Sequence, residues 1–240
     1  MVTIRRRTVA SLEVPRAVQP RAQARPPAAL TSRRKRAFDL IASVAIFVII
    51  SPLWFLIALA IKLSSPGPVL FRQERIGVGG QPFTLYKFRT MHNGVSDEVH
   101  RRFVTGMILG SVESTAISAY DGAFKLARDA RVTVVGRWLR RTSLDELPQL
   151  LNVIAGDMSL VGPRPPLAYE VDRYEPWQHE RLSVLPGITG LWQVSGRNRL
   201  SYLDMIRLDI AYARDWTFRR DLLIAIKTPW TMFVDRGGAA

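Results

Sequence analysis

The strongest feature of the hydrophobic pattern is a run of 22 uncharged residues, 40–61, between Asp39 and Lys62. Nearly all of these residues are Ile, Leu, Val, Ala, Phe or Trp. As a straight helix rising ~1.5 Å per residue, the run would measure ~33 Å, which matches a bilayer hydrocarbon core of ~30 Å. The run has no polar face, so it predicts a membrane-inserted helix and not the core helix of a soluble protein.

A break is expected near the centre of this run. Pro52 lacks an N–H and leaves a carbonyl around Val48 without its helical donor, so the helix should kink, and the Ser51 hydroxyl can bond to the freed backbone. Basic residues flank both ends of the run, whereas a spanning helix should carry them mainly on the cytoplasmic side. The sequence therefore favours a re-entrant hairpin with both ends on the cytoplasmic face. A kinked transmembrane anchor is the alternative.

The pattern after residue 64 predicts a small, mostly helical domain of the α+β class. A short β-hairpin is expected from two alternating segments, 69–74 and 83–91, around a glycine-rich turn. Helices are expected over residues 134–141, 203–216 and 222–233. The last helix is strongly apolar and contains Trp230, so it either lies on the bilayer surface as an interfacial helix or packs into the core.

The net charge of +14 is concentrated at the N-terminus. Residues 1–36 hold ten basic residues against the single acid Glu13, and so supply +9 of the total. Residues 1–32 are rich in Pro and Ala and lack apolar periodicity, which predicts a disordered basic tail. Basic residues beside a membrane helix gain roughly 1 kcal/mol each from an anionic leaflet. With no helix-turn-helix pattern or aromatic-basic groove in the sequence, the charge indicates a membrane surface and not nucleic acid.

The candidate chemistry is an adjacent pair of carboxylates, Asp145 and Glu146. Ser143 and Glu146 have the spacing of a capping box, so helix capping alone explains them equally well. Pro148 weakens that interpretation, because it would fall at the fifth helical position and disturb the helix. Beside Arg140 at a helix start, the pair is typical of an anion site that contains carboxylates. The sequence has no cysteine, which excludes a thiol nucleophile, a disulfide framework and a cysteine-ligated zinc ion.

Three further cations stand in patterns that suit phosphate. Lys87 shares one face of the second predicted strand with Arg89, and by default this is an exposed cationic face. Arg164 lies between two prolines, which restrict the backbone and hold the guanidinium in place. Arg197 follows a glycine-rich loop that also offers a tryptophan ring and a glutamine amide, a set that suits either a nucleotide or a structural role.

Together, these segments resemble the bacterial sugar transferases, also called monotopic phosphoglycosyl transferases. The resemblance runs from about residue 34 to residue 233, and the motifs follow the family order. Each motif alone is weak, but their joint order is specific. The motifs are Phe38-Asp39, Ser51-Pro52, Tyr86-Lys87-Phe88-Arg89-Thr90-Met91, Ser143-Leu144-Asp145-Glu146-Leu147, Gly162-Pro163-Arg164-Pro165 and Pro186-Gly187-Ile188-Thr189-Gly190. We expect a short form of the family, without the transmembrane helices that precede this domain in larger members.

The resemblance implies an enzyme that transfers a hexose-1-phosphate from a UDP-sugar to undecaprenyl phosphate, the first membrane step of exopolysaccharide assembly. It implies that Asp145 attacks the β-phosphate, expels UMP and forms a covalent aspartyl phospho-sugar. It further implies that Glu146 binds Mg²⁺. Substrate phosphates would be bound by Arg140 and Arg164, with Lys87 and Arg197 as additional contacts.

The expected plan has three parts: a basic tail over residues 1–32, a membrane-inserted hairpin over 33–63 and the phosphoglycosyl transferase domain over 64–234. The resemblance places this domain on the cytoplasmic face of the bacterial inner membrane. It leaves the sugar and the formation of a homo-oligomer open. The alternative function is a membrane-tethered basic binding protein without catalysis. A conventional nucleotide-sugar glycosyltransferase is disfavoured, because the sequence has no Asp-x-Asp motif.

Overall fold

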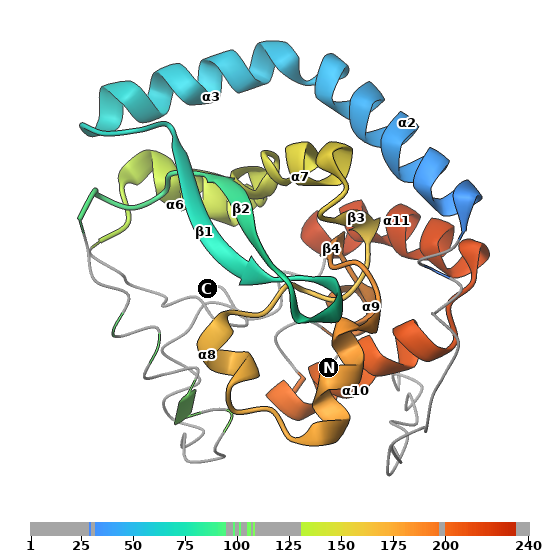
Figure 1. Ribbon diagram of the computed structural model, residues 1–240. Coiled ribbons are helices and arrows are strands. Elements are labelled where there is room, and N and C mark those ends of the chain that lie inside the picture. The colour runs from blue at the N-terminus through green and yellow to red at the C-terminus, as the bar shows by residue number, and fades with distance from the viewer. Residues whose placement is uncertain are drawn as a thin grey trace, which may run out of the picture.

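The computed structural model describes residues 29, 32–94, 98, 101, 105–106, 108, 131–196 and 200–233. Most of the predicted basic tail over 1–32 and the predicted site residue Arg197 lie outside the described residues. The helices are α2 (Arg33–Ile49), α3 (Ser51–Ser64), α6 (Val134–Thr142), α7 (Gln149–Ala155), α8 (Ala168–Val171), α9 (Leu191–Ser195), α10 (Tyr202–Arg214) and α11 (Phe218–Phe233), with 3₁₀ turns at Val78–Gly80, Leu144–Glu146 and Pro176–Ser183. The strands are β1 (Leu70–Ile76), β2 (Pro82–Phe88), β3 (Ser159–Val161) and β4 (Gly187–Thr189). The protein is therefore a mixed fold, mostly helical, with two small sheets (Figure 1).

Helices α2 and α3 form a bent pair that arches over the rest of the domain (Figure 1). Among the described residues, no single helix has both the length and the apolar character to cross a membrane, but this pair meets the test jointly and is bent by 63°. At the break, the Ser51 hydroxyl donates to the Val48 carbonyl at 2.8 Å. Phe47 and Trp54 meet edge to face below the break, with ring centroids 4.9 Å apart. The predicted Ser-Pro break and its hydroxyl bond are both confirmed.

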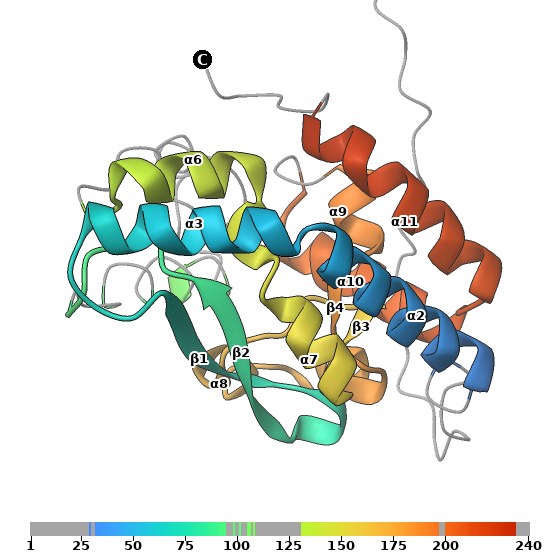
Figure 2. The same ribbon diagram turned by 90° about the horizontal axis from the view of Figure 1, so that it is seen from above.

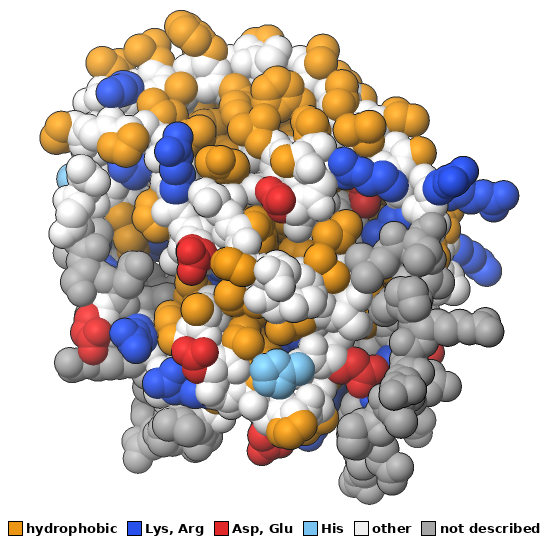
Figure 3. Space-filling view, viewed as in Figure 1, with side chains coloured by type: hydrophobic (Ala, Val, Ile, Leu, Met, Phe, Trp, Pro, Cys, Tyr) orange, Lys and Arg blue, Asp and Glu red, His pale blue; other side chains and the backbone are white. Residues whose placement is uncertain are grey.

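Helix α2 carries a stripe of polar residues inward and most of its large aliphatic residues outward. Lys35, Asp39 and Ser43 follow one another at four-residue intervals and are all buried, with Lys35 only 4% exposed. On the opposite side, large aliphatic side chains are open, with Ile49 76% exposed. Figure 3 shows hydrophobic side chains covering the surface formed by the bent pair. A contiguous apolar surface of this kind marks contact with lipid or another protein, because soluble surfaces rarely expose one.

A buried polar network holds α2 onto the domain. Lys35 Nζ donates to Asp221 Oδ2 on α11 at 2.6 Å and to the Val161 carbonyl on β3 at 3.0 Å. The Tyr212 hydroxyl of α10 donates to Asp221 Oδ1 at 2.7 Å. One turn along α2, Asp39 accepts from the Ser159 hydroxyl at 2.7 Å. Since a buried charge is tolerated only when it is paired, these bonds fix the position of α2 relative to α10, α11 and β3.

The predicted hairpin is present as β1 and β2, which pair antiparallel with Leu70 opposite Phe88. The prediction of an exposed cationic face on its second strand is wrong for Arg89. This residue lies just past the end of β2 and is buried, and its Nη2 donates to the Ser65 carbonyl at 2.6 Å and to the Ile61 carbonyl at 3.3 Å. Arg89 therefore caps the end of α3, because carbonyls in a last helical turn lack intrahelical donors.

Two short strands bring distant loops together. β3 and β4 pair in parallel, with Ser159 opposite Gly187. Their backbones approach so closely that a Cβ on Gly187 would lie 2.1 Å from the Gly162 nitrogen, and one on Gly162 would lie 2.4 Å from the Leu185 carbonyl oxygen. Only glycine allows this approach. The loops that follow the two strands consequently lie side by side.

The predicted helices are confirmed, and α6 runs alongside α3 while α11 runs alongside α2 (Figure 2). The core-packing interpretation of the last helix holds for one of its faces, and its other face is exposed. Asp221 and Ile224 of α11 are buried, whereas Ile226 and Trp230 are exposed, Trp230 by 68%. Helix α11 therefore contributes both to the core and to the apolar surface around the bent pair.

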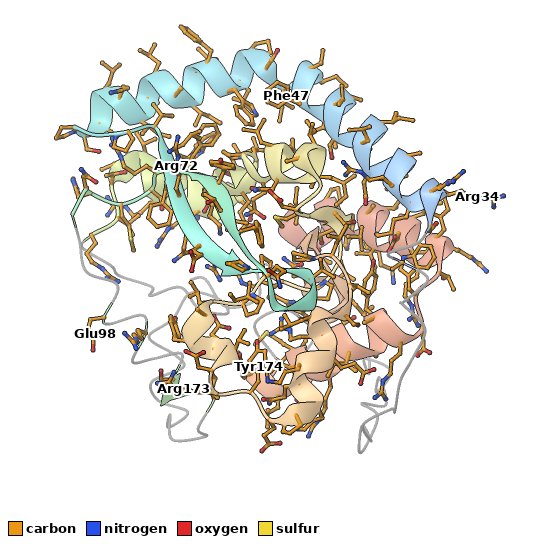
Figure 4. All side chains as sticks on the ribbon, viewed as in Figure 1. Arg34, Phe47, Arg72, Glu98, Arg173 and Tyr174 are labelled. Atoms are coloured by element: carbon orange, nitrogen blue, oxygen red, sulfur yellow. The ribbon has the colours of Figure 1, made fainter. Side chains whose placement is uncertain are left out.

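We predict that Lys35→Met lowers the free energy of unfolding by about 3–5 kcal/mol, because Asp221 then loses its buried cation. The control is Arg34→Met, which removes an exposed charge from the adjacent position of α2; Arg34 points away from the domain (Figure 4). Thermal unfolding of the full-length protein in detergent measures both effects. Equal midpoints for the two variants would contradict the prediction.

Candidate active site

The acidic pair lies in a tight turn between two helices. Helix α6 ends at Thr142; Ser143 follows in a left-handed conformation with φ 57°, and the 3₁₀ turn Leu144–Glu146 comes directly after it. Pro148 occupies the cap position before α7, where its missing N–H costs nothing. The Ser143 side chain makes no cap hydrogen bond. The capping-box interpretation of Ser143 and Glu146 is therefore wrong.

Lys87 and Arg164 approach the acidic pair from different parts of the chain. Lys87 Nζ on β2 donates to Glu146 Oε1 at 2.9 Å, and Arg164 Nη1 lies 3.9 Å from the same oxygen. Asp145 is 5% exposed, whereas Glu146 is half-buried. Of the six predicted catalytic and substrate-binding residues, the structure thus brings Asp145, Glu146, Lys87 and Arg164 together.

The charge of Lys87 depends on its neighbours. Burial lowers the pKa of Lys87 below its usual range, and Arg164 lowers it further, whereas Glu146 and Asp145 act in the opposite direction. Both carboxylates therefore lie within electrostatic range of this ammonium group. Burial outweighs the two carboxylates in setting this pKa, and a charged lysine with little water around it attracts an incoming phosphate more strongly than an exposed one.

Arg140 is fixed one turn before the acidic pair. Its Nε donates to the Thr90 hydroxyl at 3.0 Å. Thr90 follows β2, which carries Lys87, while Arg140 precedes the turn that carries Asp145. The bond therefore joins the two segments that supply the site, and the role of Arg140 at a phosphate stays a prediction.

The site also contains residues that the sequence did not single out. Arg75 and Gln149, both buried, line the hollow around Lys87, Glu146 and Arg164. Arg75 sits near the end of β1, where an inward-facing arginine is a usable signal only once the strand register is known. Gln149 begins α7, and its position depends on where that helix starts. Spacing along the sequence determines neither the strand register nor the residue at which α7 begins.

The residues present are compatible with a magnesium ion. Within the part of the chain that the structure describes, no group of three or more His, Cys, Asp or Glu side chains forms a complete metal cage. Mg²⁺ usually needs only one or two carboxylates, together with substrate phosphate oxygens and water. Glu146 offers one carboxylate beside cations that suit phosphate. This donor set fits a Mg²⁺ ion that binds together with a phosphate substrate.

An acidic pair among fixed cations is typical of an enzyme that transfers phosphate groups. Comparison with known families agrees with a transferase. The chain belongs to the bacterial sugar transferase family, whose model matches residues 30–235. The resemblance found in the sequence motifs is confirmed.

Named relatives are similar over most of this chain. The exopolysaccharide production protein ExoY of Rhizobium meliloti (strain 1021) is 42% identical over 203 residues, 85% of this chain and 87% of the relative. The undecaprenyl-phosphate galactose phosphotransferase of Salmonella typhimurium is 43% identical over 81% of this chain, but only 39% of the relative is covered. The UDP-glucose:undecaprenyl-phosphate glucose-1-phosphate transferase of Caulobacter vibrioides is 43% identical over 81% of this chain and 68% of the relative.

We predict that Gly136→Ala destabilises the protein by about 1–3 kcal/mol, because overpacking a close contact forces the backbone to shift. The added Cβ would lie 2.0 Å from the Thr90 carbonyl oxygen, so α6 must move away from the residue that binds Arg140. Arg137→Ala, at an exposed position of the same helix, is the control. Thermal unfolding distinguishes them, and an unchanged midpoint for Gly136→Ala would refute the close contact.

Proposed function

We propose that this protein transfers a sugar-1-phosphate from a UDP-sugar to undecaprenyl phosphate and releases UMP. The observation that carries the proposal is the meeting of Glu146 with Lys87 and Arg164 in one hollow, with Asp145 adjacent to Glu146 in the same turn. The family and the names of the relatives, which include a galactose phosphotransferase and a glucose-1-phosphate transferase that act on undecaprenyl phosphate, support the choice of substrates. The ExoY relative supports a role in exopolysaccharide production.

In the first half of the proposed reaction, a carboxylate oxygen of Asp145 attacks the β-phosphorus of the UDP-sugar. The bond between this phosphorus and the bridging oxygen breaks, UMP leaves with that oxygen, and the sugar-1-phosphate stays on Asp145. Such aspartyl-phosphate intermediates divide one difficult transfer into two easier ones. Asp145 suits this role because the tight turn before α7 fixes its backbone and few water molecules can reach its buried side chain.

In the second half, a phosphate oxygen of undecaprenyl phosphate attacks the same phosphorus, and Asp145 leaves as a free carboxylate. The product is undecaprenyl diphosphate-sugar. Lys87 and Arg164 stabilise the negative charge on the phosphate oxygens in both halves, Arg164 through a planar guanidinium that can bind two oxygens at once. Arg140 is proposed to contact the leaving phosphate from the end of α6.

Glu146 is proposed as the protein ligand of Mg²⁺. When bound, the ion supplies positive charge to the phosphate oxygens. The Lys87–Glu146 ion pair then has a second purpose, because it holds the Glu146 carboxylate in the hollow before the substrate arrives. The ion pair fixes both side chains, so little side-chain ordering has to accompany binding.

The bilayer is the proposed environment of the bent helix pair. An inward polar stripe and an outward apolar surface on α2 are the reverse of a soluble helix. A re-entrant hairpin that enters from the cytoplasmic face of the bacterial inner membrane would bring the hollow to the headgroup level. A lipid phosphate and a soluble nucleotide can meet only there.

We predict that Asp145→Asn abolishes UMP release, because an amide cannot act as the nucleophile. Glu146→Gln should lower the rate by at least about tenfold and weaken its dependence on Mg²⁺, since a neutral amide is a poorer Mg²⁺ ligand. The assay supplies the membrane-bound protein with a UDP-hexose, undecaprenyl phosphate and Mg²⁺ and follows UMP. Release of UDP, or full UMP release by Asp145→Asn, would refute the mechanism.

A second prediction concerns topology. Ser32→Cys and Ser64→Cys place single thiols at the two ends of the bent pair in a chain that has no other cysteine. A membrane-impermeant maleimide should label neither thiol in intact cells and both in inverted membrane vesicles, because both ends face the cytoplasm. Labelling of the two positions from opposite sides would indicate a spanning helix instead.

A further inference from the structure

The loop that carries Arg164 is held almost entirely through its carbonyl oxygens. Its three prolines, at positions 163, 165 and 166, remove the N–H groups that would otherwise tie it to neighbouring strands. Four consecutive carbonyls accept hydrogen bonds instead. The donors are Gly187 N to Pro163 O at 2.8 Å, Arg181 Nη2 to Arg164 O at 3.0 Å, Arg75 Nη1 to Pro165 O at 3.0 Å and Ile76 N to Pro166 O at 3.0 Å.

Arg181 holds the loop through a bond to the Arg164 carbonyl. It belongs to the 3₁₀ segment Pro176–Ser183 and is 5% exposed. Its Nη2 also bonds to Asp209 Oδ2 on α10 at 2.5 Å, and its Nη1 donates to the Tyr174 hydroxyl at 2.7 Å. These partners fix the guanidinium, so the Arg164 carbonyl is bonded to a group that cannot move with it.

Arg75, on strand β1 of the hairpin, holds the next carbonyl of the loop, that of Pro165. It is 6% exposed, and the Gln73 side chain accepts from its Nε at 3.1 Å and its Nη2 at 2.7 Å. The remaining Nη1 is directed at the Pro165 carbonyl. Two buried guanidinium groups, from separate elements, therefore hold the backbone of residues 164 and 165.

Burying these groups is costly for stability. Burial, together with the nearby charge of Arg164, lowers the pKa of Arg75 to about 10. Burial likewise raises the pKa of Asp209 to about 6, although Arg181 opposes the shift. Well-packed apolar residues often replace such buried pairs without loss of stability, so folding alone gives a weak reason for these two arginines.

Electrostatics supply a stronger reason. Arg164, Arg75 and Lys87 are like charges around one hollow, since Arg164 lowers the pKa of both of the others. Their mutual repulsion would drive the Arg164 loop outward toward water. At 3.9 Å, the attraction between Arg164 and Glu146 is weaker than a direct hydrogen bond. The backbone bonds to residues 164 and 165 resist this repulsion.

From these contacts, we propose that Arg75 and Arg181 are positioning residues, which fix the Arg164 guanidinium at the phosphate-binding hollow by holding the loop backbone. The inference rests on the proposed function, because it assigns Arg164 to substrate phosphates. A displacement of about 1 Å at such a group can cost about 100-fold in rate. Loss of the Arg75 or Arg181 bond to the loop is therefore expected to lower the reaction rate, and to do so through Arg164.

The test is a double-mutant cycle on UMP release by the full-length membrane-bound protein. Arg75→Gln removes the guanidinium that bonds to the Pro165 carbonyl. Arg181→Gln combined with Asp209→Asn removes the guanidinium that bonds to the Arg164 carbonyl, without leaving a buried charge unpaired. Each is measured alone and together with Arg164→Gln. We expect Arg75→Gln, and likewise the Arg181→Gln/Asp209→Asn pair, to lower kcat/KM about 10- to 100-fold in the natural background. In the Arg164→Gln background, where no guanidinium remains to be positioned, each should lower it at most about twofold.

The matched control is Glu180→Gln, at the position before Arg181. Glu180 pairs with Arg214 and so also joins the 3₁₀ segment to α10, but it makes no bond to the loop. This variant should keep its kcat/KM within about twofold. Thermal unfolding of every variant identifies any loss of folded protein, which would lower the rate by the same factor in both backgrounds.

The outcomes separate the two hypotheses. If Asp145→Asn is inactive, two results would overturn the positioning inference. One is an equal loss of kcat/KM in both backgrounds, and the other is no loss of kcat/KM on substitution of Arg75 or of Arg181 with Asp209. Full UMP release by Asp145→Asn would instead overturn the proposed function. Partial recovery by Arg75→Lys would support the inference, because lysine keeps a cationic donor for the Pro165 carbonyl but lacks the planar fork that also binds Gln73.

Discussion

The buried bonds of Lys35 and Asp39 are the constraint on which the arrangement of this protein depends. Helix α2 exposes its apolar side chains, so hydrophobic burial alone gives it little reason to dock on the domain. Its inward stripe of charged and hydroxyl groups docks it instead, through Asp221, Val161 and Ser159. A single set of directional bonds thereby fixes the apolar surface relative to β3 and the core around α10.

The same docking reaches the acidic pair through α7. Arg36, adjacent to Lys35, donates to the carbonyls of Val153 and Ile154 near the end of α7 at 2.6 and 3.0 Å. The start of this helix is set by Pro148, immediately after the turn that holds Asp145 and Glu146. The helix that faces outward and the turn that carries the carboxylates are therefore braced against a common element.

The hollow itself concentrates positive charge around the Glu146 carboxylate, next to the buried Asp145. Lys87, Arg75 and Arg164 come from a strand pair and a proline-rich loop, and no covalent neighbour holds them together. Like charges at this spacing repel, so their proximity requires rigid backbones and opposite charges nearby. The hairpin ladder, the carbonyl bonds of the loop and the carboxylate of Glu146 meet this requirement, and the result suits a substrate that carries several negative charges.

Sequence alone determined the features that depend on local chemistry. The apolar run, the missing N–H of Pro52, the hairpin and the ordered motifs around Asp145 are local patterns, and they predicted the bent pair, most of the elements and the family. Only the tertiary structure decided that Ser143 does not cap a helix, that Arg89 is buried beneath α3, and that Arg75 and Arg181 hold the Arg164 loop. These outcomes depend on which distant backbone carbonyl or carboxylate lies within bonding distance, and a spacing along the chain carries no information about that distance.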